Sequence, residues 1–576
     1  MYVIGSGPAG VACAYALIKK GLKVTMLDAG IELEQEKSKI LEKLQKSKHR
    51  ESRGFSSYKG ISDSFKKWDT KLLEKIKGNT QVSVKGVPRK LVYGSDYPYK
   101  EASNHMPLSA EGIIANPSFA YGGLSNVWGA AVMPYLSEDI KDWPITLNQL
   151  APYYTAVLEF MNIAAGNIEN PRDSLAIETP KGFLSIGTPK DFLAVKESKI
   201  SLIDGLQELF PIYARDCQNF NYSRQASLLM EDLKFNKKKL NDAGIFFGSS
   251  RLAVQFDDRE KPGCVYCGLC LHGCPYKLIY SSAFTVDKLR KNKNFKYQKD
   301  VIVEKIAEKE GSVTILAHGR NNKKRIIFKG SRVFLACGAL TTTRIMLESM
   351  GAYNEEVILK DSQYYLFHLL RYKSGGDVTK EYLHTLAQVY IEIFDKVIDE
   401  NSVHLQLYTY SDLYDNALKG IFGAGYGIFQ KPLKQIMSRL IIGQGYLHSN
   451  SSSTISVKLE KGSKKLYLRK NENKSSNRKI KDIMWKLFKN RGYIKAMPLI
   501  PLLKIGKTGE SNHLGGSFPM RKNPKRFQTD VLGRPFGYKK VHLVDSSVFP
   551  SIPAQTITLT VMANAYRIAD QHDKLK

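Results

Sequence analysis

The first thirty residues alternate between short apolar runs and a glycine-rich turn. Residues 1–4 are a short apolar run, the turn covers 5–10, small apolar residues with helical spacing fill 11–20, and a second apolar run over 23–27 ends on Asp28. This order predicts a strand, a tight loop, a helix that ends at Gly21, and a second strand. Such a unit, followed by an acid, is typical of a dinucleotide-binding domain.

The turn Gly5-Ser6-Gly7-Pro8-Ala9-Gly10 has the residue types that a dinucleotide requires. Gly5 permits the tight turn, Gly7 lets backbone approach a pyrophosphate, and Gly10 lets the helix pack closely on the strand. The N-terminus of the helix offers unpaired N–H groups to the anion. Asp28 is placed to accept hydrogen bonds from an adenosine ribose.

Two segments of the first 160 residues stand apart from this unit. Residues 31–90 are polar and basic, with Ile40, Leu41 and Leu44 at helical spacing, and they are expected to form an insertion between elements of the sheet. Residues 121–129 are rich in glycine, which lets backbone approach a ligand closely. A helical pattern follows near residues 150–160.

Alternation of apolar and polar positions marks short strands in the middle of the chain. Three of them, separated by turn signals, predict a β-meander over 297–306, 313–317 and 325–328. Residues 333–339 are expected to form a buried parallel strand that runs into a glycine turn and a helix.

Longer alternating strands, such as 385–393 and 403–410, lie in the stretch 360–505. They predict a separate antiparallel sheet, which we expect to face the substrate. An apolar stripe over 480–488, flanked by Lys and Arg, allows two interpretations. One is a helix that lies on a membrane surface. The commoner one is a surface helix packed on the core, with a solvated basic face.

At 576 residues the chain is expected to form two or more domains. Its formal net charge of +31 suggests attraction to polyanions or to an anionic membrane, or simply abundant lysine on solvated faces. Repeated basic and aromatic interleaving of the kind that stacks bases is missing from the sequence, so nucleic acid is not an expected partner. No apolar run reaches eighteen residues and no secretory signal precedes the first strand, so we expect a cytoplasmic protein, with peripheral membrane contact left open.

Four of the seven cysteines fall within eleven positions. Cys264, Cys267, Cys270 and Cys274, with Pro275 after them, reproduce the C-x₂-C-x₂-C-x₃-C-P spacing of bacterial ferredoxin loops. This spacing predicts a [4Fe-4S] or [3Fe-4S] cluster in a reducing compartment. A zinc knuckle and a thiol loop without metal are the open alternatives.

The C-terminal region of the chain carries motifs that occur together in one family. It resembles the glucose-methanol-choline (GMC) oxidoreductases, nearest to their pyranose-oxidase and sugar-dehydrogenase branch. The opening glycine turn, the Gly122-Gly123 segment and the Cys337-Gly338-Ala339 strand appear in the family's order, so the resemblance covers both ends and most of the middle. The C-terminal motifs are 511–520, 541–550 and 558–560.

The resemblance implies an α/β fold, α+β overall, in which a Rossmann-like FAD-binding domain is assembled from discontinuous segments around an inserted antiparallel-sheet substrate domain. The corresponding division of the chain is a first FAD-binding segment over 1–150, a substrate or cap segment over 151–250, a second FAD-binding segment with the cysteine loop 264–275 over 251–350, the substrate domain over 351–505, and a third FAD-binding segment over 506–576.

The resemblance also assigns positions around the cofactor. It implies that Gly5, Gly7 and Gly10 hold the FAD pyrophosphate and that Asp28 holds the adenosine ribose. It places Gly122, Gly123 and Asn126 against the flavin, the backbone of Val301 against the adenine, and Asp545 near the ribityl and pyrophosphate region. Relatives that tether FAD covalently use a histidine in the segment matching 125–128. Position 127 here is Val, so we expect non-covalent FAD.

His513 matches the family's active-site histidine, which takes the proton of a substrate hydroxyl while flavin N5 accepts hydride from the same carbon. An imidazole suits this role because its ordinary pKa of about 6.5 allows it to be a neutral acceptor at working pH and to become a stabilised cation as the alkoxide forms. The family's second polar partner, His or Asn, corresponds to Thr556, with Gln555 as a neighbouring amide. This departure leaves the substrate class open.

These features predict an FAD-dependent dehydrogenase that oxidises a hydroxyl of a sugar, a sugar derivative or another alcohol. Electrons would leave through the cysteine loop to an electron-acceptor protein or a quinone. The alternative is a non-catalytic flavoprotein that serves as an electron-transfer or assembly subunit.

Overall fold

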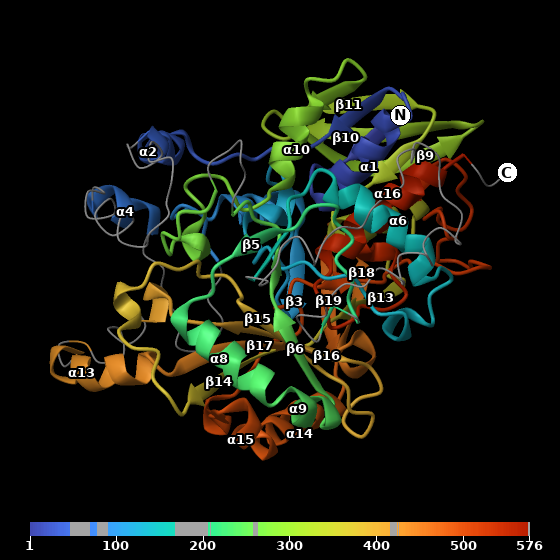
Figure 1. Cartoon of the computed structure of the whole chain (residues 1–576). Coiled ribbons are helices and arrows are strands. Elements are labelled where there is room, and N and C mark those ends of the chain that lie inside the picture. Colours follow the sequence, from blue (N-terminus) through green and yellow to red (C-terminus); the bar gives the residue numbers. More distant parts are fainter. Residues whose placement is uncertain are drawn as a thin grey trace.

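The structure is a computed structural model of the chain. The residues that it describes are 1–46, 70–77, 90–166, 206–207, 209–256, 263–414, 423 and 426–573. The predicted insertion over 31–90 and the predicted segment over 151–250 therefore lie partly outside the described residues. Figure 1 shows the N-terminal strand, helix α1 and the meander strands in the upper half of the molecule, and a broad antiparallel sheet with helices beneath it in the lower half.

A five-stranded parallel sheet carries the N-terminal glycine turn. Its order is β23-β12-β1-β2-β8, so strands from both ends and the middle of the chain lie side by side. Helices α1 and α16 pack together, with α6 and α10 beside them. The elements are β1 (Tyr2–Ile4), α1 (Pro8–Lys19), β2 (Val24–Leu27), α6 (Leu147–Leu158), α10 (Ser282–Leu289), β8 (Phe295–Gln298), β12 (Val333–Leu335), β23 (Val541–Leu543) and α16 (Thr558–Gln571). The predicted strand–loop–helix–strand unit is confirmed.

The predicted meander forms a three-stranded antiparallel sheet, with one correction. Its strands are β9 (Val301–Lys309), β10 (Ser312–Gly319) and β11 (Arg325–Gly330), and α11 (Ala339–Met350) packs on β9. The single strand predicted over 297–306 is wrong, because Asp300 has a positive φ of 62° and breaks it. The residues before Asp300 form β8, which belongs to the parallel sheet.

The predicted antiparallel sheet is present and has the order β20-β14-β17-β16-β15-β6, with β21 paired to β14. Its alternate side chains form an apolar face that packs against helices, because β-strand residues two apart point to the same side. The strands are β6 (Ile245–Ser249), β14 (Tyr364–Arg371), β15 (Val389–Ile393), β16 (Val403–Tyr408), β17 (Leu440–Tyr446), β20 (Ala496–Pro498) and β21 (Lys504–Ile505). The helices are α8 (Arg224–Phe235), α9 (Lys237–Asp242), α14 (Ser475–Lys489) and α15 (Arg491–Ile494), at the bottom of Figure 1.

The apolar stripe on α14 belongs to this core. Ile480, Ile483, Met484 and Leu487 are buried against the sheet, which confirms the interpretation of a core-packing helix. Trp485 is the large apolar residue of this helix that stays exposed. Among the described residues, no helix combines the length and the apolar character needed to cross a membrane.

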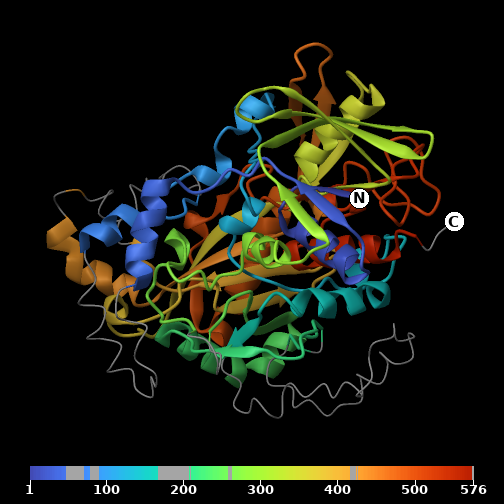
Figure 2. The ribbon, with the colours of Figure 1, turned by 90° about the horizontal axis from the view of Figure 1, so that it is seen from above.

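Two smaller sheets and several helices complete the described structure. The sheet β22-β13-β18-β19-β3 consists of β3 (Leu108–Glu111), β13 (Glu356–Asp361), β18 (Thr454–Leu459), β19 (Leu466–Asn471) and β22 (Leu514–Gly515). The other contains β4 (Ala164–Gly166), β5 (Gln218–Phe220) and β7 (Arg251–Leu252). The remaining α-helices are α2 (Gln35–Lys46), α4 (Thr70–Lys77), α5 (Ala102–His105) and α13 (Tyr426–Met437). Figure 2 shows α2 and α4, in blue, on the side of the molecule away from the two termini.

Candidate active site

The glycine turn between β1 and α1 has the shape of a nucleotide cradle. A Cβ on Gly10 would lie 1.9 Å from the carbonyl oxygen of Gly5, and Gly5 itself has a φ of +98°. Both positions therefore require glycine for the turn to close. Gly7 differs, because a Cβ there would meet no heavy atom within 4 Å. The open side of Gly7, at the uncapped N-terminus of α1, is where a pyrophosphate would approach.

Asp28 lies at the end of β2, next to this turn. Its buried carboxylate accepts hydrogen bonds from the N–H of Ser6 at 3.2 Å, the hydroxyl of Ser6 at 2.7 Å and the hydroxyl of Tyr297 at 3.0 Å. Burial raises the pKa of Asp28 to about 6. The backbone N–H of Val301 donates to the carbonyl of Asp28 at 3.0 Å, so the two positions predicted for the adenosine end are neighbours.

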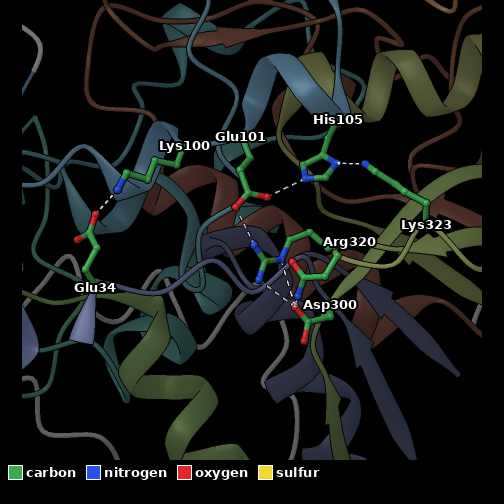
Figure 3. A network of polar contacts seen from close by, with 8 residues as sticks. Glu34, Lys100, Glu101, His105, Asp300, Arg320 and Lys323 are labelled. Atoms are coloured by element: carbon green, nitrogen blue, oxygen red, sulfur yellow. Dashed lines mark hydrogen bonds and ion pairs between the residues drawn. The ribbon is translucent and has the colours of Figure 1, made fainter. Parts of the chain in front are cut away.

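A polar network fastens the start of β9 to the segment near α5 (Figure 3). Arg320 donates to Glu101 at 2.8 Å and to Asp300 at 3.0 Å, and Glu101 also contacts the His105 imidazole at 3.0 Å. Because Asp300 directly precedes Val301, this network fixes the backbone that is predicted to meet the adenine. Lys323 reaches the other nitrogen of His105 at 3.4 Å.

The glycine-rich loop predicted to contact the flavin folds over the glycine turn. The N–H of Gly122 donates to the hydroxyl of Ser6 at 2.9 Å, and a Cβ on Gly123 would lie 3.2 Å from the Cα of Gly7. The side chain of Asn126 donates to the carbonyl of Gly123 at 2.8 Å and so holds its own loop closed. The loop and the turn thus form one continuous cradle.

Asp545 comes from the C-terminal region of the chain, just beyond β23. Its carboxylate is buried, accepts a hydrogen bond from the N–H of Ser547 at 3.0 Å and is also bonded by Thr342. Burial raises its pKa. The pKa of Cys337 is raised by burial first and then by the charges of Asp545 and Asp28, so both carboxylates lie near the same end of the parallel sheet.

His513 directly precedes β22. A hydrogen bond between Leu514 and Ser546, the residues that follow His513 and Asp545, links the two segments. The hydroxyl of Ser546 donates to the carbonyl of Leu514 at 2.6 Å, which places the His513 loop beside the Asp545 segment. The imidazole ring of His513 stacks on Tyr446 of β17 with 5.1 Å between ring centroids. His513 therefore lies between the Asp545 segment and the antiparallel sheet.

A short relay of hydrogen bonds positions His513. Its backbone N–H donates to the hydroxyl of Ser511 at 2.9 Å, and that hydroxyl donates to the carboxylate of Asp361 at 2.7 Å. The other oxygen of Asp361 accepts from the N–H of Gly509 at 2.7 Å. The Nδ1 atom of His513 is buried and has no partner among the described residues. A fixed backbone with an unpaired ring nitrogen suits a proton acceptor.

The acid limb of activity should report the protonation of His513. Burial first, and the charge of His404 second, lower the pKa of His513 to about 4, so its imidazole is neutral above that pH. We expect kcat/KM to hold as pH falls through 6.5, the ordinary histidine value, and to drop as pH approaches 4. The measurement is a pH profile of kcat/KM over the range in which circular dichroism shows a folded protein.

One control is needed for this profile, because burial raises the pKa of Asp361 to about 7. The variant Asp361→Asn removes that titration and should keep the limb near pH 4. A fall in kcat/KM near pH 6.5 in both proteins would contradict the assignment of His513 as a neutral imidazole down to about pH 4.

Gln555 and Thr556 are both buried, close to the antiparallel sheet. The amide of Gln555 donates to Glu392 at 3.1 Å and to Ser402 at 2.7 Å, while its carbonyl oxygen has no partner among the described residues. The hydroxyl of Thr556 also lacks a partner there. The structure thus places unpaired polar atoms at the two positions where the family's pattern is altered.

A set of polar side chains on the antiparallel sheet was missed in the prediction from sequence. They are Tyr364, Glu392, His404, Gln406, Tyr408 and Tyr446, all buried. The available signal was a polar residue at every second position of strands whose other positions are apolar, as in Tyr390-x-Glu392 and His404-x-Gln406. Such a pattern indicates a second buried face that is polar.

The cysteine loop shows the turns that the sequence predicts but not a metal centre. Gly268 and Gly273 have φ values of +71° and +102°. Burial raises the pKa values of all four thiols, and the sulfurs of Cys264 and Cys274 accept backbone hydrogen bonds at 3.4 Å. Across the portion of the chain that the structure describes, no three His, Cys, Asp or Glu side chains are grouped so that they could hold a metal ion. The described residues therefore show no metal centre at this loop, and we derive no electron path through it.

Comparison with protein families identifies the chain. Models described as GMC oxidoreductase match residues 226–360 and 502–565, and a model described as an NAD(P)-binding Rossmann-like domain matches residues 3–33. The chain belongs to the GMC oxidoreductase family. This confirms the resemblance to the family and the predicted fold class, and it supports an FAD-dependent oxidoreductase. The predicted branch of the family stays a prediction.

Solved structures share the fold of this GMC oxidoreductase. Pyridoxine 4-oxidase from Mesorbium loti has 12% identity and a TM-score of 0.55, and the match covers 100% of this chain and 99% of that one. A formate oxidase has 13% identity and a TM-score of 0.56, with 100% and 97% covered. A formate oxidase variant from Aspergillus oryzae has 12% identity and a TM-score of 0.56, with 100% and 98% covered. A search of curated proteins found no match.

The cradle of this GMC oxidoreductase fits FAD. An open glycine face at a helix N-terminus suits a pyrophosphate, and the buried carboxylate of Asp28 suits an adenosine ribose. The residues that would hold FAD are Gly5, Gly7, Gly10, Asp28, Gly122, Gly123, Asn126, Val301 and Asp545.

Proposed function

We propose that this GMC oxidoreductase oxidises a hydroxyl group of a sugar, a sugar derivative or another alcohol, with His513 as the proton acceptor. The observation that carries the proposal is a neutral imidazole with an unpaired, buried Nδ1, fixed beside the Asp545 segment. FAD, when bound, supplies the acceptor for the hydride that leaves the substrate carbon.

Residues of the chain position the base, accept the proton and exclude water. Asp361, through Ser511, holds the backbone of His513, and Tyr446 supports the ring by stacking on it. His513 takes the hydroxyl proton, so the negative charge on the substrate oxygen never develops fully in a buried site. Burial of the surrounding tyrosines excludes water from the reacting atoms.

The neighbouring structures support the fold and leave the substrate open. They are named as oxidases of pyridoxine and of formate, two unlike compounds, and their identity to this chain is 12–13%. We propose non-covalent FAD because position 127 is Val. Acid precipitation should therefore release the flavin into the supernatant, whereas a covalent flavin would stay in the pellet.

Anaerobic reduction of the bound flavin tests the proposed reaction. Protein reconstituted with FAD should lose its visible flavin absorption when a substrate alcohol is added without oxygen. Candidate polyols and simple alcohols serve as probes, and dithionite serves as the control that the flavin is reducible. Reduction by dithionite and by none of the alcohols would instead favour the alternative, a non-catalytic electron-transfer or assembly subunit.

The electron acceptor is a separate element of the proposal. We propose a dehydrogenase that passes electrons through an iron-sulfur cluster to a protein or a quinone. The support for the cluster is the ferredoxin-like spacing of the cysteines alone. Anaerobically purified protein should then contain about three or four iron atoms per chain and give a cluster signal in electron paramagnetic resonance. Iron-free protein that still reduces its flavin with an alcohol would remove the cluster and leave the hydroxyl oxidation standing.

Peripheral membrane contact rests on the net charge of +31 alone. The apolar stripe of α14 gives it no support, because those side chains pack on the sheet.

A further inference from the structure

The two faces of the antiparallel sheet have opposite character. One face is apolar and packs on α8 and α14, with Val403, Leu405 and Leu407 of β16 pointing to it. The other face carries the intervening residues of the same strand, His404, Gln406 and Tyr408, which are equally buried. Burying polar side chains is costly unless they are hydrogen-bonded, so a polar buried face indicates a specific use.

A chain of hydrogen bonds runs across this polar face. Tyr408 donates to the carbonyl oxygen of Gln406 at 2.9 Å, and the amide nitrogen of Gln406 contacts Nε2 of His404 at 3.2 Å. Nδ1 of His404 is bonded to one oxygen of Glu392, and the other oxygen of Glu392 accepts from Gln555 at 3.1 Å. We call Glu392, His404, Gln406 and Tyr408 the polar wall.

The polar wall dictates how Gln555 is oriented. Glu392 can only accept, so it must face the N–H groups of both His404 and Gln555. Ser402 accepts from the same Gln555 amide nitrogen at 2.7 Å. Both N–H groups of the amide are thereby engaged, and the carbonyl oxygen of Gln555 remains buried without a partner among the described residues.

Two further buried polar atoms without a partner among the described residues belong to Thr556 and Tyr364. Thr556 directly follows Gln555 in the sequence. Tyr364 packs in a cluster with Tyr446 and Ala554, the residue that precedes Gln555. Tyr446 stacks on His513 at 5.1 Å and on His404 at 6.2 Å between centroids, so this cluster adjoins the proposed base. Unpaired buried polar groups on Tyr364 and on the two residues that follow Ala554, whose side chain contacts Tyr364, indicate a ligand that pairs them.

We propose that Gln555, Thr556 and Tyr364 bind hydroxyl groups beside the one that is oxidised, and that the polar wall positions Gln555 for this task. This rests on the proposed oxidation of a hydroxyl group. The Gln555 carbonyl oxygen can only accept, so the substrate must donate a hydroxyl to it. The substrate class is therefore a polyhydroxy compound, such as a sugar or polyol. A site built to bind a hydroxyl rejects analogues that lack it, because its own polar groups stay unpaired.

The two adjacent tyrosines of β14 provide a matched test. Tyr364→Phe and Tyr365→Phe each remove one buried hydroxyl that has no partner among the described residues. The two residues differ in position, because Tyr365 belongs to the apolar face of the sheet. D-glucose and sorbitol are the polyhydroxy probes, and ethanol and benzyl alcohol are the monohydroxy probes. The readout is the rate of anaerobic flavin reduction as a function of probe concentration.

Wild-type protein should favour the polyhydroxy probes. Tyr364→Phe should lower kcat/KM for them by about tenfold and Gln555→Leu by about 100-fold, and in each variant the loss should be larger with the polyhydroxy probes than with the monohydroxy probes. Tyr365→Phe should match the wild type. Glu392→Gln frees the Gln555 amide to rotate, so it should raise KM for the polyhydroxy probes far more than it lowers kcat. A merely structural loss would lower kcat for both classes and disturb the flavin spectrum.

The outcomes separate this inference from the proposed function. If no alcohol reduces the wild-type flavin, the proposed oxidation fails and this inference fails with it. If alcohols reduce it but Gln555→Leu and Tyr364→Phe keep the wild-type ratio between probe classes, or if the wild type prefers monohydroxy probes, the inference alone is overturned.

Discussion

The variant His513→Ala should keep its FAD and lose about 1,000-fold in the rate of flavin reduction by substrate. The imidazole has an unpaired nitrogen in the site and is not a component of the glycine cradle, so its removal affects the proton transfer and leaves cofactor binding intact. Stopped-flow absorption under anaerobic conditions measures the rate, and the flavin spectrum reports the bound cofactor.

His542 provides a matched control for this experiment. It is a buried histidine of the same C-terminal segment, and one of its ring nitrogens, Nε2, likewise has no partner among the described residues, but it lies in β23 and its ring stacks on Phe334 at 4.8 Å between centroids. His542→Gln should lower thermal stability and leave the rate of flavin reduction near the wild-type value in the folded fraction. An unchanged rate in His513→Ala would remove that residue from the mechanism.

Two glycine substitutions should separate folding of the cradle from cofactor binding. Gly10→Ala places a methyl group 1.9 Å from the Gly5 carbonyl oxygen, so it should destabilise the apoprotein, by about 1–3 kcal/mol if the turn can shift. Gly7→Ala adds a methyl group in open space at a φ of −67°, which alanine readily adopts. Its apoprotein should be as stable as the wild type.

The effect on FAD distinguishes the two variants further. In Gly7→Ala the new methyl group occupies the side from which a pyrophosphate approaches, so FAD affinity should fall at least about tenfold, or about 1.4 kcal/mol. Thermal unfolding of the apoprotein and fluorescence titration with FAD measure the two quantities. Wild-type FAD affinity in Gly7→Ala would show that the cofactor does not use this turn.

The dinucleotide-binding unit could be predicted because its constraints are local. Gly5 and Gly10 are required by the backbone within six residues of each other, and Asp28 follows within one strand–helix–strand unit. The break at Asp300 could not be predicted in the same way. A single residue with positive φ turns one alternating run into strands of two different sheets, and alternation continues across it.

The polar face of the antiparallel sheet could not be predicted from the sequence, because it depends on residues that are far apart in the chain. Alternation in β15 and β16 predicts strands, but it does not say what either face packs against. That depends on Gln555, which is 163 residues away from Glu392 and reaches it only in the folded chain. The cysteine spacing likewise predicts the turns of a loop, but it does not determine where the sulfur atoms lie in the folded chain.

A crystal structure of the FAD-bound protein tests the central claim most directly, through the distance from the nearest ring nitrogen of His513 to flavin N5. The account predicts a pyrophosphate on the Gly5–Gly10 turn and a distance below about 6 Å, which one substrate carbon and its oxygen would bridge. A flavin bound elsewhere, or a His513 ring turned away and more than about 10 Å from N5, would contradict it.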